Sequence, residues 1–277
     1  MNPARGIPHA GETAPIVGRL AGALVALDFD GTLAAISPLP DDVRIEPGAT
    51  TMVRNVHRSG ALVAIVTGRT VESVLRAGIS EIIDLPGLII YGLHGAERWE
   101  DGVLDTPGTP PGIALLRESL PTTLRTLTPD PALWVEDKRI SLVVHTRLTA
   151  DPDGILDAIT PSACAAAEEV GLVAHVGKEV VEISLPDIDK GVALRALLSS
   201  STTAAYYAGD DFGDLPAFHE VHAWSTRTGK PGVRIGVVSD ANSPVTGHVD
   251  VEVCEPGEVV AFFNDLVTKE TPPDHHE

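Results

Sequence analysis

Short runs of apolar residues, each followed by a polar segment that contains glycine, recur along this chain of 277 residues. The first three runs occupy residues 22–27, 61–66 and 88–91, and helical stretches at 48–59 and 70–77 separate them. A nearly continuous apolar run is typical of a strand that is buried on both faces of a sheet. Because these strands alternate with helices, the pattern predicts βαβ units and a parallel sheet.

The alternation stops at a segment with the composition of a linker, TPGTPPG at residues 106–112, and resumes after Pro186. Between them the order helix, strand, strand occurs twice, which predicts a small α+β insert. Its helices are expected at 113–127 and 153–170, and its strands at 133–135, 140–145, 172–176 and 180–184. After the insert we expect a helix at 190–198, strands at 204–208 and 233–238, and a last helix at 258–267.

The chain is therefore expected to form one α/β domain, leave it to build a second domain, and return. The predicted core covers residues 21–107 and 187–267, and the predicted cap covers residues 108–186. Residues 1–20 are expected to form a flexible leader and residues 268–277 a flexible tail. In an open α/β sheet, ligands bind at the carboxyl ends of the parallel strands, so we expect the functional site there.

The charge balance limits the partners that the protein can have. There are 20 Lys and Arg residues against 39 Asp and Glu residues, which gives a net charge of −19. So acidic a surface repels nucleic acids and anionic membranes, and an anionic substrate must be held by local cations or a metal. Apolar residues make up 43% of the chain and charged residues 21%, which excludes a disordered or collagen-like protein.

No uncharged run reaches the roughly 20 residues that a membrane-spanning helix needs. The segment from Met1 to Gly18 lacks the long apolar stretch of a secretory signal. The two cysteines, Cys164 and Cys254, have no metal-ligand spacing, and we expect them to be reduced thiols. We therefore expect a cytoplasmic monomer that acts on a small molecule, without nucleic acid or membrane partners.

The strongest chemical signal is the sequence DFDGTL at residues 28–33, directly after the first buried run. Residues two apart on a strand point to the same face, so Asp28 and Asp30 are expected to present two carboxylates together. One carboxylate can attack phosphorus while the other handles a proton at the leaving oxygen. The alternative is an ordinary Asp-Gly turn after a strand.

Two further segments supply groups that suit a phosphate. Thr67, Gly68 and Arg69 follow the second strand and offer a hydroxyl and backbone N–H groups at a strand-to-helix junction. Lys190 opens a helix just after the insert, and its ammonium group can meet the phosphate and screen repulsion from Asp28. Taken singly, each segment also fits an ordinary loop or a solvated lysine.

The last signal is GDDFGD at residues 209–214, after the strand at 204–208. Three carboxylates at one strand end, from Asp210, Asp211 and Asp214, would repel one another without a cation. Mg²⁺ prefers carboxylates together with a phosphate oxygen of the substrate, so we expect Mg²⁺ here. One of the three aspartates could instead serve only to cap the next helix.

Together these segments resemble the four motifs of the haloacid dehalogenase superfamily, whose core is a Rossmann-like parallel sheet. The second aspartate resembles the general acid/base of its phosphatases, which the dehalogenases and phosphonate-cleaving enzymes lack. The resemblance implies that Asp28 is the nucleophile, that Asp30 is the acid/base and that Thr67 and Lys190 hold phosphoryl oxygens. It also implies a Mg²⁺ site made by Asp28, the carbonyl of Asp30 and Asp210, with Asp214 steadying the shell of the ion, and leaves open whether Asp211 or Asp214 contacts the metal directly.

A narrower resemblance, from about residue 24 to residue 265, is to the trehalose-6-phosphate phosphatases. It rests on GLHGAE at 92–97, VEDKR at 135–139, HTR at 145–147 and GKEVVEI at 177–183. The family usually has Tyr in place of Thr146, Thr in place of Gly213 and Glu in place of Leu215. The resemblance implies that the substrate is bound by eight residues: Gly68, Arg69, His94, Glu97, Glu136, Lys138, Glu182 and Asp211.

The expected function is therefore Mg²⁺-dependent hydrolysis of trehalose 6-phosphate in trehalose biosynthesis, through an aspartyl-phosphate intermediate. One alternative is the same chemistry on a mannosylglycerate-type or trehalose-like pseudo-disaccharide phosphate. The other is a catalytically silent protein that binds a sugar phosphate. Three tryptophans, Trp99, Trp134 and Trp224, are expected to be packing residues rather than sugar platforms.

Overall fold

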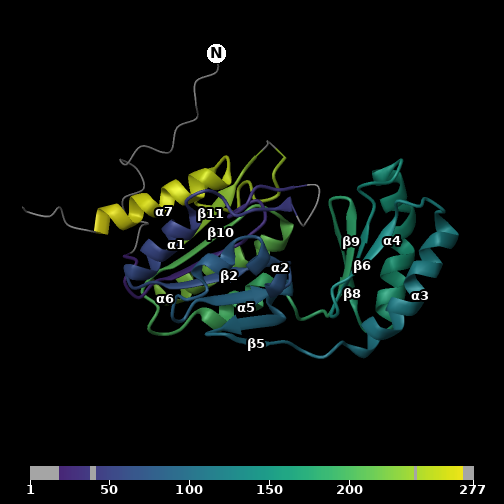
Figure 1. Ribbon diagram of the computed structural model, residues 1–277, viewed down its shortest axis with the longest axis horizontal. Coiled ribbons are helices and arrows are strands. Elements are labelled where there is room, and N and C mark those ends of the chain that lie inside the picture. Colours follow the sequence, from purple (N-terminus) through teal and green to yellow (C-terminus); the bar gives the residue numbers. More distant parts are fainter. Residues whose placement is uncertain (1–18, 38–41, 240–241, 271–277) are drawn as a thin grey trace, which may run out of the picture. The chain divides into compact units, whose positions relative to one another are not determined.

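The chain divides into two compact units, which the computed structural model describes over residues 19–37, 42–239 and 242–270 (Figure 1). The core unit comprises Met1–Asp105 and Asp189–Glu277, and the cap unit comprises Thr106–Ile188. The core unit is thus discontinuous in sequence. Most of the leader and tail expected at the two ends lies outside the described residues, while residues 268–270 belong to the last helix.

An eight-stranded sheet in the order β12-β11-β10-β1-β2-β3-β4-β5 forms the centre of the core unit (Figure 1). Its first six strands in this order are parallel to their neighbours. They are β12 Val251–Val253, β11 Gly232–Val237, β10 Ala205–Gly209, β1 Leu24–Leu27, β2 Leu62–Val66 and β3 Ile89–Gly92. The apolar runs predict five of them, and β12 is the one that they do not predict. The α/β fold class expected from the sequence is confirmed.

Strand β1 lies between two parallel neighbours, and all four of its residues are buried. Its last residue, Leu27, pairs with Ile65 of β2 and with Ala208 of β10. The carboxyl ends of β1, β2 and β10 therefore meet at one edge of the sheet. Since the chain proceeds from β1 to β2 on one side and returns to β10 on the other, this edge is a topological switch point.

Helices cover both faces of the core sheet because the strands are apolar on both faces. On one face lie α1 Ala49–Arg58, α2 Val71–Arg76 and α7 Pro256–Glu270, with Met52 and Phe263 in the core. On the other face lie α5 Lys190–Leu197 and α6 Leu215–Thr228, with Phe218 and Trp224 in the core. Three short 3₁₀ helices lie within the described residues of this unit: η2 Ile79–Ile82, η3 Leu93–Gly95 and η4 Phe212–Asp214.

A hairpin that the apolar pattern does not predict extends the core sheet at one edge. Strands β4 Glu97–Glu100 and β5 Val103–Asp105 pair antiparallel with each other, and β4 pairs antiparallel with β3. Asp101 and Gly102 connect them with φ angles of 48° and 84°. An Asp-Gly pair with positive φ is the usual two-residue hairpin turn, so this dipeptide is the sequence signal for the extra strands.

The cap unit is an antiparallel sheet with two helices on one face, which agrees with the α+β insert expected from the sequence. The strand order is β6-β7-β9-β8, and the helices are α3 Pro111–Leu127 and α4 Pro152–Glu169. The strands are β6 Trp134–Asp137, β7 Leu142–His145, β8 Val173–Gly177 and β9 Val180–Ser184.

Alternation along the cap strands divides the side chains between the two faces of the sheet. One face packs under α3 and α4 and includes Leu142, Val144 and Ile183. The opposite face carries the side chains of Trp134, Glu136, Val143, His145 and Glu182, which follow from the register of β6, β7 and β9. We call this second set the open face of the cap sheet.

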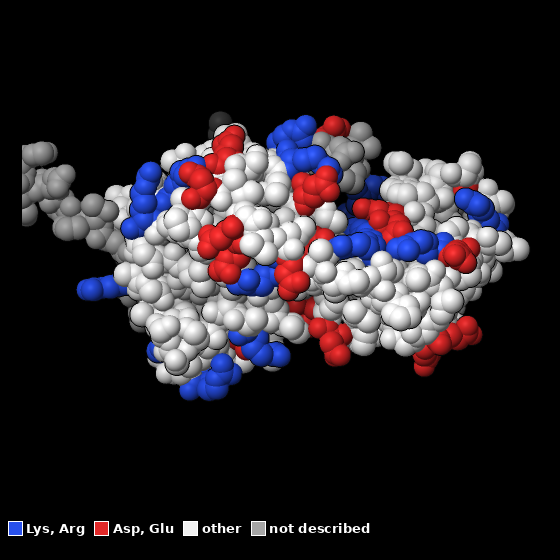
Figure 2. All heavy atoms as spheres, turned by 60° about the horizontal axis from the view of Figure 1, so that its bottom comes forward, with Lys and Arg blue, Asp and Glu red and all other residues white. Residues whose placement is uncertain are grey.

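Acidic and basic side chains are interspersed on the face of the molecule drawn in Figure 2. This face therefore does not present the continuous basic surface that binds nucleic acid backbones. Among the residues that the structure describes, no helix combines the length and apolar character needed to cross a membrane.

Candidate active site

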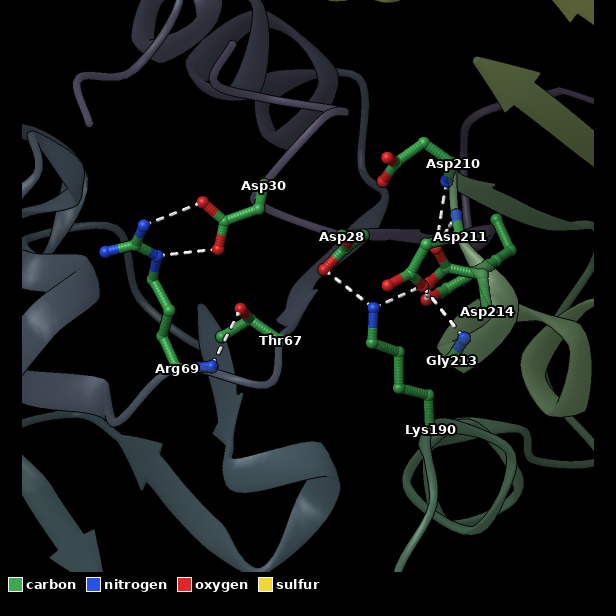
Figure 3. A network of polar contacts seen from close by, with 10 residues as sticks. Asp28, Asp30, Thr67, Arg69, Lys190, Asp210, Asp211, Gly213 and Asp214 are labelled. Carbon is green, nitrogen blue, oxygen red and sulfur yellow. Dashed lines mark hydrogen bonds and ion pairs between the residues drawn. The ribbon is translucent and has the colours of Figure 1, made fainter. Parts of the chain in front are cut away.

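Four segments that lie far apart in the sequence deliver polar side chains to the carboxyl edge of the core sheet (Figure 3). Asp28 follows β1, Thr67 follows β2 and Asp210 follows β10, while Lys190 is the first residue of α5. Asp28, Thr67 and Lys190 are each less than 4% exposed. The loops thus end in a buried polar cluster, where unpaired charges are costly.

Lys190 occupies the centre of this cluster. Its Nζ lies 2.9 Å from Oδ1 of Asp28 and 2.8 Å from Oδ1 of Asp214. Burial alone would lower the pKa of Lys190, but the two carboxylates raise it well above its ordinary value. The ammonium group therefore stays protonated and holds the Asp28 carboxylate in place.

Asp214 is fully buried and accepts hydrogen bonds from four donors. Oδ1 accepts from Lys190 and from the hydroxyl of Tyr207 at 2.6 Å. Oδ2 accepts from the backbone N–H groups of Asp210 at 2.9 Å and Asp211 at 3.1 Å. These donors use the lone pairs that a carboxylate offers, so Asp214 orients the loop and the lysine.

Asp28, Asp210 and Asp214 form the acidic cluster that could hold a cation, with one carboxylate oxygen of each within 4.8 Å of the others. Burial raises the pKa of Asp210 to about 8, and repulsion from Asp214 and Asp211 adds to the effect. Burial also raises the pKa of Asp28, against the attraction of Lys190. The single ammonium group of Lys190 therefore does not balance these carboxylates, and oxygen ligands of this kind fit a hard divalent cation.

Gly31 allows the two acidic loops to approach each other. A Cβ atom at this residue would lie 2.1 Å from Oδ2 of Asp210, and the φ angle of Gly31 is 73°. Glycine is the residue that tolerates both the positive φ and the close approach. The DFDGTL segment therefore places the carboxylate of Asp210 beside the loop that carries Asp28.

Asp30 binds Arg69, a contact that strand alternation does not predict. Arg69 binds its carboxylate in a bidentate manner, with Nε 2.6 Å from Oδ2 and Nη2 2.8 Å from Oδ1 (Figure 3). Strand β1 ends at Leu27, so the period of two does not govern Asp28 and Asp30, which lie one and three residues after it. The same arginine also donates to Ser73 and lies over the ring of Phe29.

The Thr67-Gly68-Arg69 segment is tied to the loop that follows β3. Leu93 and His94 donate their backbone N–H groups to the carbonyls of Arg69 and Thr67 at 2.8 and 2.9 Å. Both residues have positive φ angles, 49° and 58°, which is costly for residues other than glycine. The hydrogen bonds hold this conformation and set the His94 ring against Gly68, where a Cβ would lie 2.7 Å from Cε1.

Glu97, which the resemblance assigns to substrate binding, is 5% exposed. Its Oε2 accepts the backbone N–H of Val71 at 2.8 Å, at the first residue of α2. This contact gives Glu97 a structural role, because an unpaired N–H at a helix start needs an acceptor. Its role toward substrate stays a prediction.

The three cap residues of the predicted site lie in the cap unit. Glu136 accepts a 2.9 Å hydrogen bond from Nε2 of His145, which lowers the pKa of that carboxyl even though burial opposes the shift. Glu182 accepts from Ser141 at 3.0 Å. The positive charge of Lys138 also lowers the pKa of Glu136. Glu136 and Glu182 both oppose Val143 across neighbouring strands, so they share one row of the open face.

Two residues that contact the predicted site residues were not expected from the sequence to do so. Tyr207 is fully buried in β10 and its hydroxyl holds Asp214; a tyrosine in a buried strand needs a partner for its hydroxyl, and the acidic loop that follows could have indicated one. Trp134 was expected to pack inside the protein, but it is 36% exposed and stacks on His145. Trp99 and Trp224 are buried, as expected.

Comparison with known proteins gives one consistent result. Residues 26–254 match the family model described as trehalose-phosphatase. The chain is 32% identical over 208 residues to a trehalose-phosphate phosphatase of Mycobacterium marinum, covering 71% of this chain and 51% of that protein. It is 29% identical over 215 residues to a probable trehalose-phosphate phosphatase of Sinorhizobium fredii, covering 76% of each.

The fold agrees with solved structures. The C-terminal domain of trehalose-6-phosphate phosphatase from Candida albicans superposes with a TM-score of 0.71 at 16% identity, covering 90% of this chain and 93% of that one. At this identity the likeness shows the fold alone. The chain spans about half the length of the mycobacterial relatives it matches, 47% of the Mycobacterium leprae protein and 51% of the Mycobacterium marinum protein.

Proposed function

We propose, from the premise that this chain belongs to the trehalose-phosphatase family, that it hydrolyses trehalose 6-phosphate to trehalose and phosphate. The observation that carries the proposal is the buried contact of Asp28 with Lys190 beside Asp210, at the switch point of the sheet. A buried carboxylate held by an ammonium group next to a cation-binding cluster suits phosphoryl transfer.

Asp28 supplies the nucleophile in this proposal. An oxygen of its carboxylate attacks phosphorus, the bond from phosphorus to the sugar oxygen breaks, and Asp30, as the general acid, delivers a proton to that oxygen. Asp30 then takes a proton from a water molecule, whose oxygen attacks phosphorus and releases Asp28. Arg69 orients Asp30 through its two hydrogen bonds, while Thr67 and Lys190 hold phosphoryl oxygens.

Mg²⁺ fits the acidic cluster, with Asp28, the Asp30 carbonyl and Asp210 as its ligands. When bound, it supplies positive charge to the phosphoryl oxygens and offsets the repulsion among the carboxylates. Asp214 was expected to steady the shell of the ion, and its four hydrogen bonds, which hold Asp210, Asp211 and Lys190, support that role.

Added Mg²⁺ is expected to raise the melting temperature by more at pH 8 than at pH 6. The ion must displace the proton that Asp210 retains below its pKa of about 8. The apparent Kd for Mg²⁺ should therefore rise roughly tenfold for each pH unit below that value. Thermal unfolding with and without Mg²⁺ across this pH range measures the effect, and chelation should abolish phosphate release.

Asp210→Asn should remove the stabilisation by Mg²⁺ at both pH values. Asp105→Asn serves as the matched control, because Asp105 is an exposed carboxylate on the edge strand β5. An equal Mg²⁺-dependent shift in Asp210→Asn and in the wild type would contradict this assignment of the cation. Full turnover after exhaustive chelation would contradict a role for any metal.

Glu182→Ala and Lys138→Ala are expected to reduce kcat/KM for trehalose 6-phosphate by roughly ten- to hundredfold. Each change leaves sugar hydroxyls without a partner, which costs about 1–3 kcal/mol. Hydrolysis of p-nitrophenyl phosphate, which has no sugar, should change little. Steady-state assays with both substrates test the prediction, and Glu168→Ala on the exposed side of α4 is the control.

Equal losses on both substrates would assign these cap residues to folding rather than to sugar binding. The same pair of assays separates the alternatives for the whole protein. Turnover of a different disaccharide phosphate, with none of trehalose 6-phosphate, would keep the chemistry and replace the substrate. Binding without turnover of any sugar phosphate would indicate a silent binding protein.

A further inference from the structure

Two aromatic rings are stacked on the open face of the cap sheet. The ring centroids of Trp134 and His145 lie 4.2 Å apart with an interplanar angle of 6°. The two residues are direct cross-strand partners on β6 and β7. Aromatic cross-strand pairs stabilise a sheet, and most of that stabilisation comes from burying the rings. The indole of Trp134, however, keeps part of its apolar surface in contact with water.

Trp134 is distinguished from the other two tryptophans by its exposure. It is 36% exposed, whereas Trp99 is 5% and Trp224 is 2% exposed. It lies on β6, an edge strand of the cap sheet, so His145 covers the indole only from the side of β7. The indole therefore presents apolar surface at the rim of the open face without serving the helix-covered core.

The stack is fixed by a second contact. Nε2 of His145 lies 2.9 Å from Oε2 of Glu136, and the side chain of His145 is 13% exposed. Trp134 and Glu136 are two residues apart on β6, so they point to the same side of the sheet. The imidazole of His145 thus stacks on the indole of Trp134 and contacts the carboxylate of Glu136, and these two interactions fix the positions of both side chains.

A flat apolar surface beside carboxylates is the arrangement that suits a neutral pyranose ring. One face of such a ring consists of C–H groups, which pack on an indole, while its rim of hydroxyls donates to carboxylate oxygens. Glu136 accepts at one position of the open face, and Glu182 lies in the same row across Val143. A phosphate group would be repelled by these two carboxylates, so the surface favours the uncharged part of a substrate.

We propose that Trp134 is a specificity-determining residue of the cap, on which a pyranose ring of the substrate stacks, and that His145 positions both Trp134 and Glu136 for it. This inference rests on the proposed function, since it assigns the sugar part of that substrate to a further residue. Trp134 directly precedes the VEDKR segment at residues 135–139 and is not one of the residues that carry the resemblance given above.

The first test uses the fluorescence of the chain of 277 residues, with trehalose as the probe. Trp134 is the exposed tryptophan, so a sugar ring that covers it should shift the emission to shorter wavelength in a saturable manner. Trp134→Phe should lose this shift, because the two remaining tryptophans are buried. A saturable shift that persists in Trp134→Phe would overturn the proposal.

The second test separates binding from chemistry with trehalose 6-phosphate as substrate. Trp134→Ala should raise KM roughly fivefold with a much smaller change in kcat, because an aromatic contact of this kind contributes about 1 kcal/mol. Trp134→Phe should recover most of the loss, since phenylalanine keeps an aromatic face. Leu148→Ala is the control, because Leu148 is a cap residue that is 59% exposed and lies outside the open face.

An unchanged KM in Trp134→Ala, with normal turnover by the wild type, would overturn the inference and leave the proposed function intact. If the wild type does not hydrolyse trehalose 6-phosphate, the proposed function fails. The fluorescence titration, repeated with glucose, maltose and mannose, then decides the inference separately. A Trp134-dependent shift with one of these sugars would support it, and the absence of a shift with all of them would overturn it.

Discussion

Asp28→Asn is expected to abolish phosphate release from trehalose 6-phosphate, lowering kcat by about a thousandfold or more. The amide has nearly the size of the carboxylate but is a poor nucleophile. The melting temperature should change little, because the loss of the 2.9 Å contact with Lys190 is offset by relief of repulsion from Asp214 and Asp210. A phosphate-release assay together with thermal unfolding checks both parts.

Asp84→Asn is the control for this change. Asp84 pairs with Arg54 at 2.8 Å, and its side chain is 68% exposed on the core unit. Its amide variant should therefore keep normal turnover. Near-normal turnover of Asp28→Asn would exclude an aspartyl-phosphate intermediate at this residue, whichever sugar phosphate proves to be the substrate.

Lys190→Met is expected to abolish turnover and to lower the free energy of unfolding by about 3–5 kcal/mol. Lys190 is 2% exposed, and its removal leaves the buried carboxylates of Asp28 and Asp214 without their cation. Chemical denaturation measures the stability, and the phosphate-release assay measures the activity.

The loss of stability in Lys190→Met should be larger at pH 8 than at pH 5. Without the ammonium group, burial and mutual repulsion raise the pKa of these carboxyls above the unfolded value. Below the raised pKa they take up protons and the repulsion falls, so the native state recovers stability as the pH decreases. Lys269→Met, at the exposed end of α7, should change neither quantity. A loss that is the same at both pH values would argue against this electrostatic origin.

The order of elements in the core could be predicted from the sequence for a local reason. A strand buried on both faces must be apolar along its whole length, so runs such as LVAL at Leu24–Leu27 identify it. Parallel strands that share a sheet end at the same edge. The positions of Asp28, Thr67 and Asp210 after their strands were therefore enough to expect them in one site, and the described structure places all three at that edge.

Contacts that depend on the direction of a side chain could not be predicted in this way. Asp30 pairs with Arg69, a residue 39 positions away. No local pattern encodes that pairing, because β1 ends before the motif and the chain direction changes at Gly31. Tyr207 likewise looks like one more core residue until the segment that follows β10 is folded as η4 and the tyrosine hydroxyl meets Asp214.

The sequence alone determined that an α+β cap interrupts the core and that Glu136, Lys138 and Glu182 lie in it. Only the tertiary structure decided what surrounds them. The strand order β6-β7-β9-β8 brings Glu136 and Glu182, 46 positions apart, into one row across Val143. The same order places Trp134 on an edge strand, which has a neighbouring strand on one side only. A tryptophan is expected to be packed in the core, but in this position 36% of its surface stays exposed. Burial depends on which strands become neighbours, and that is a property of the folded sheet.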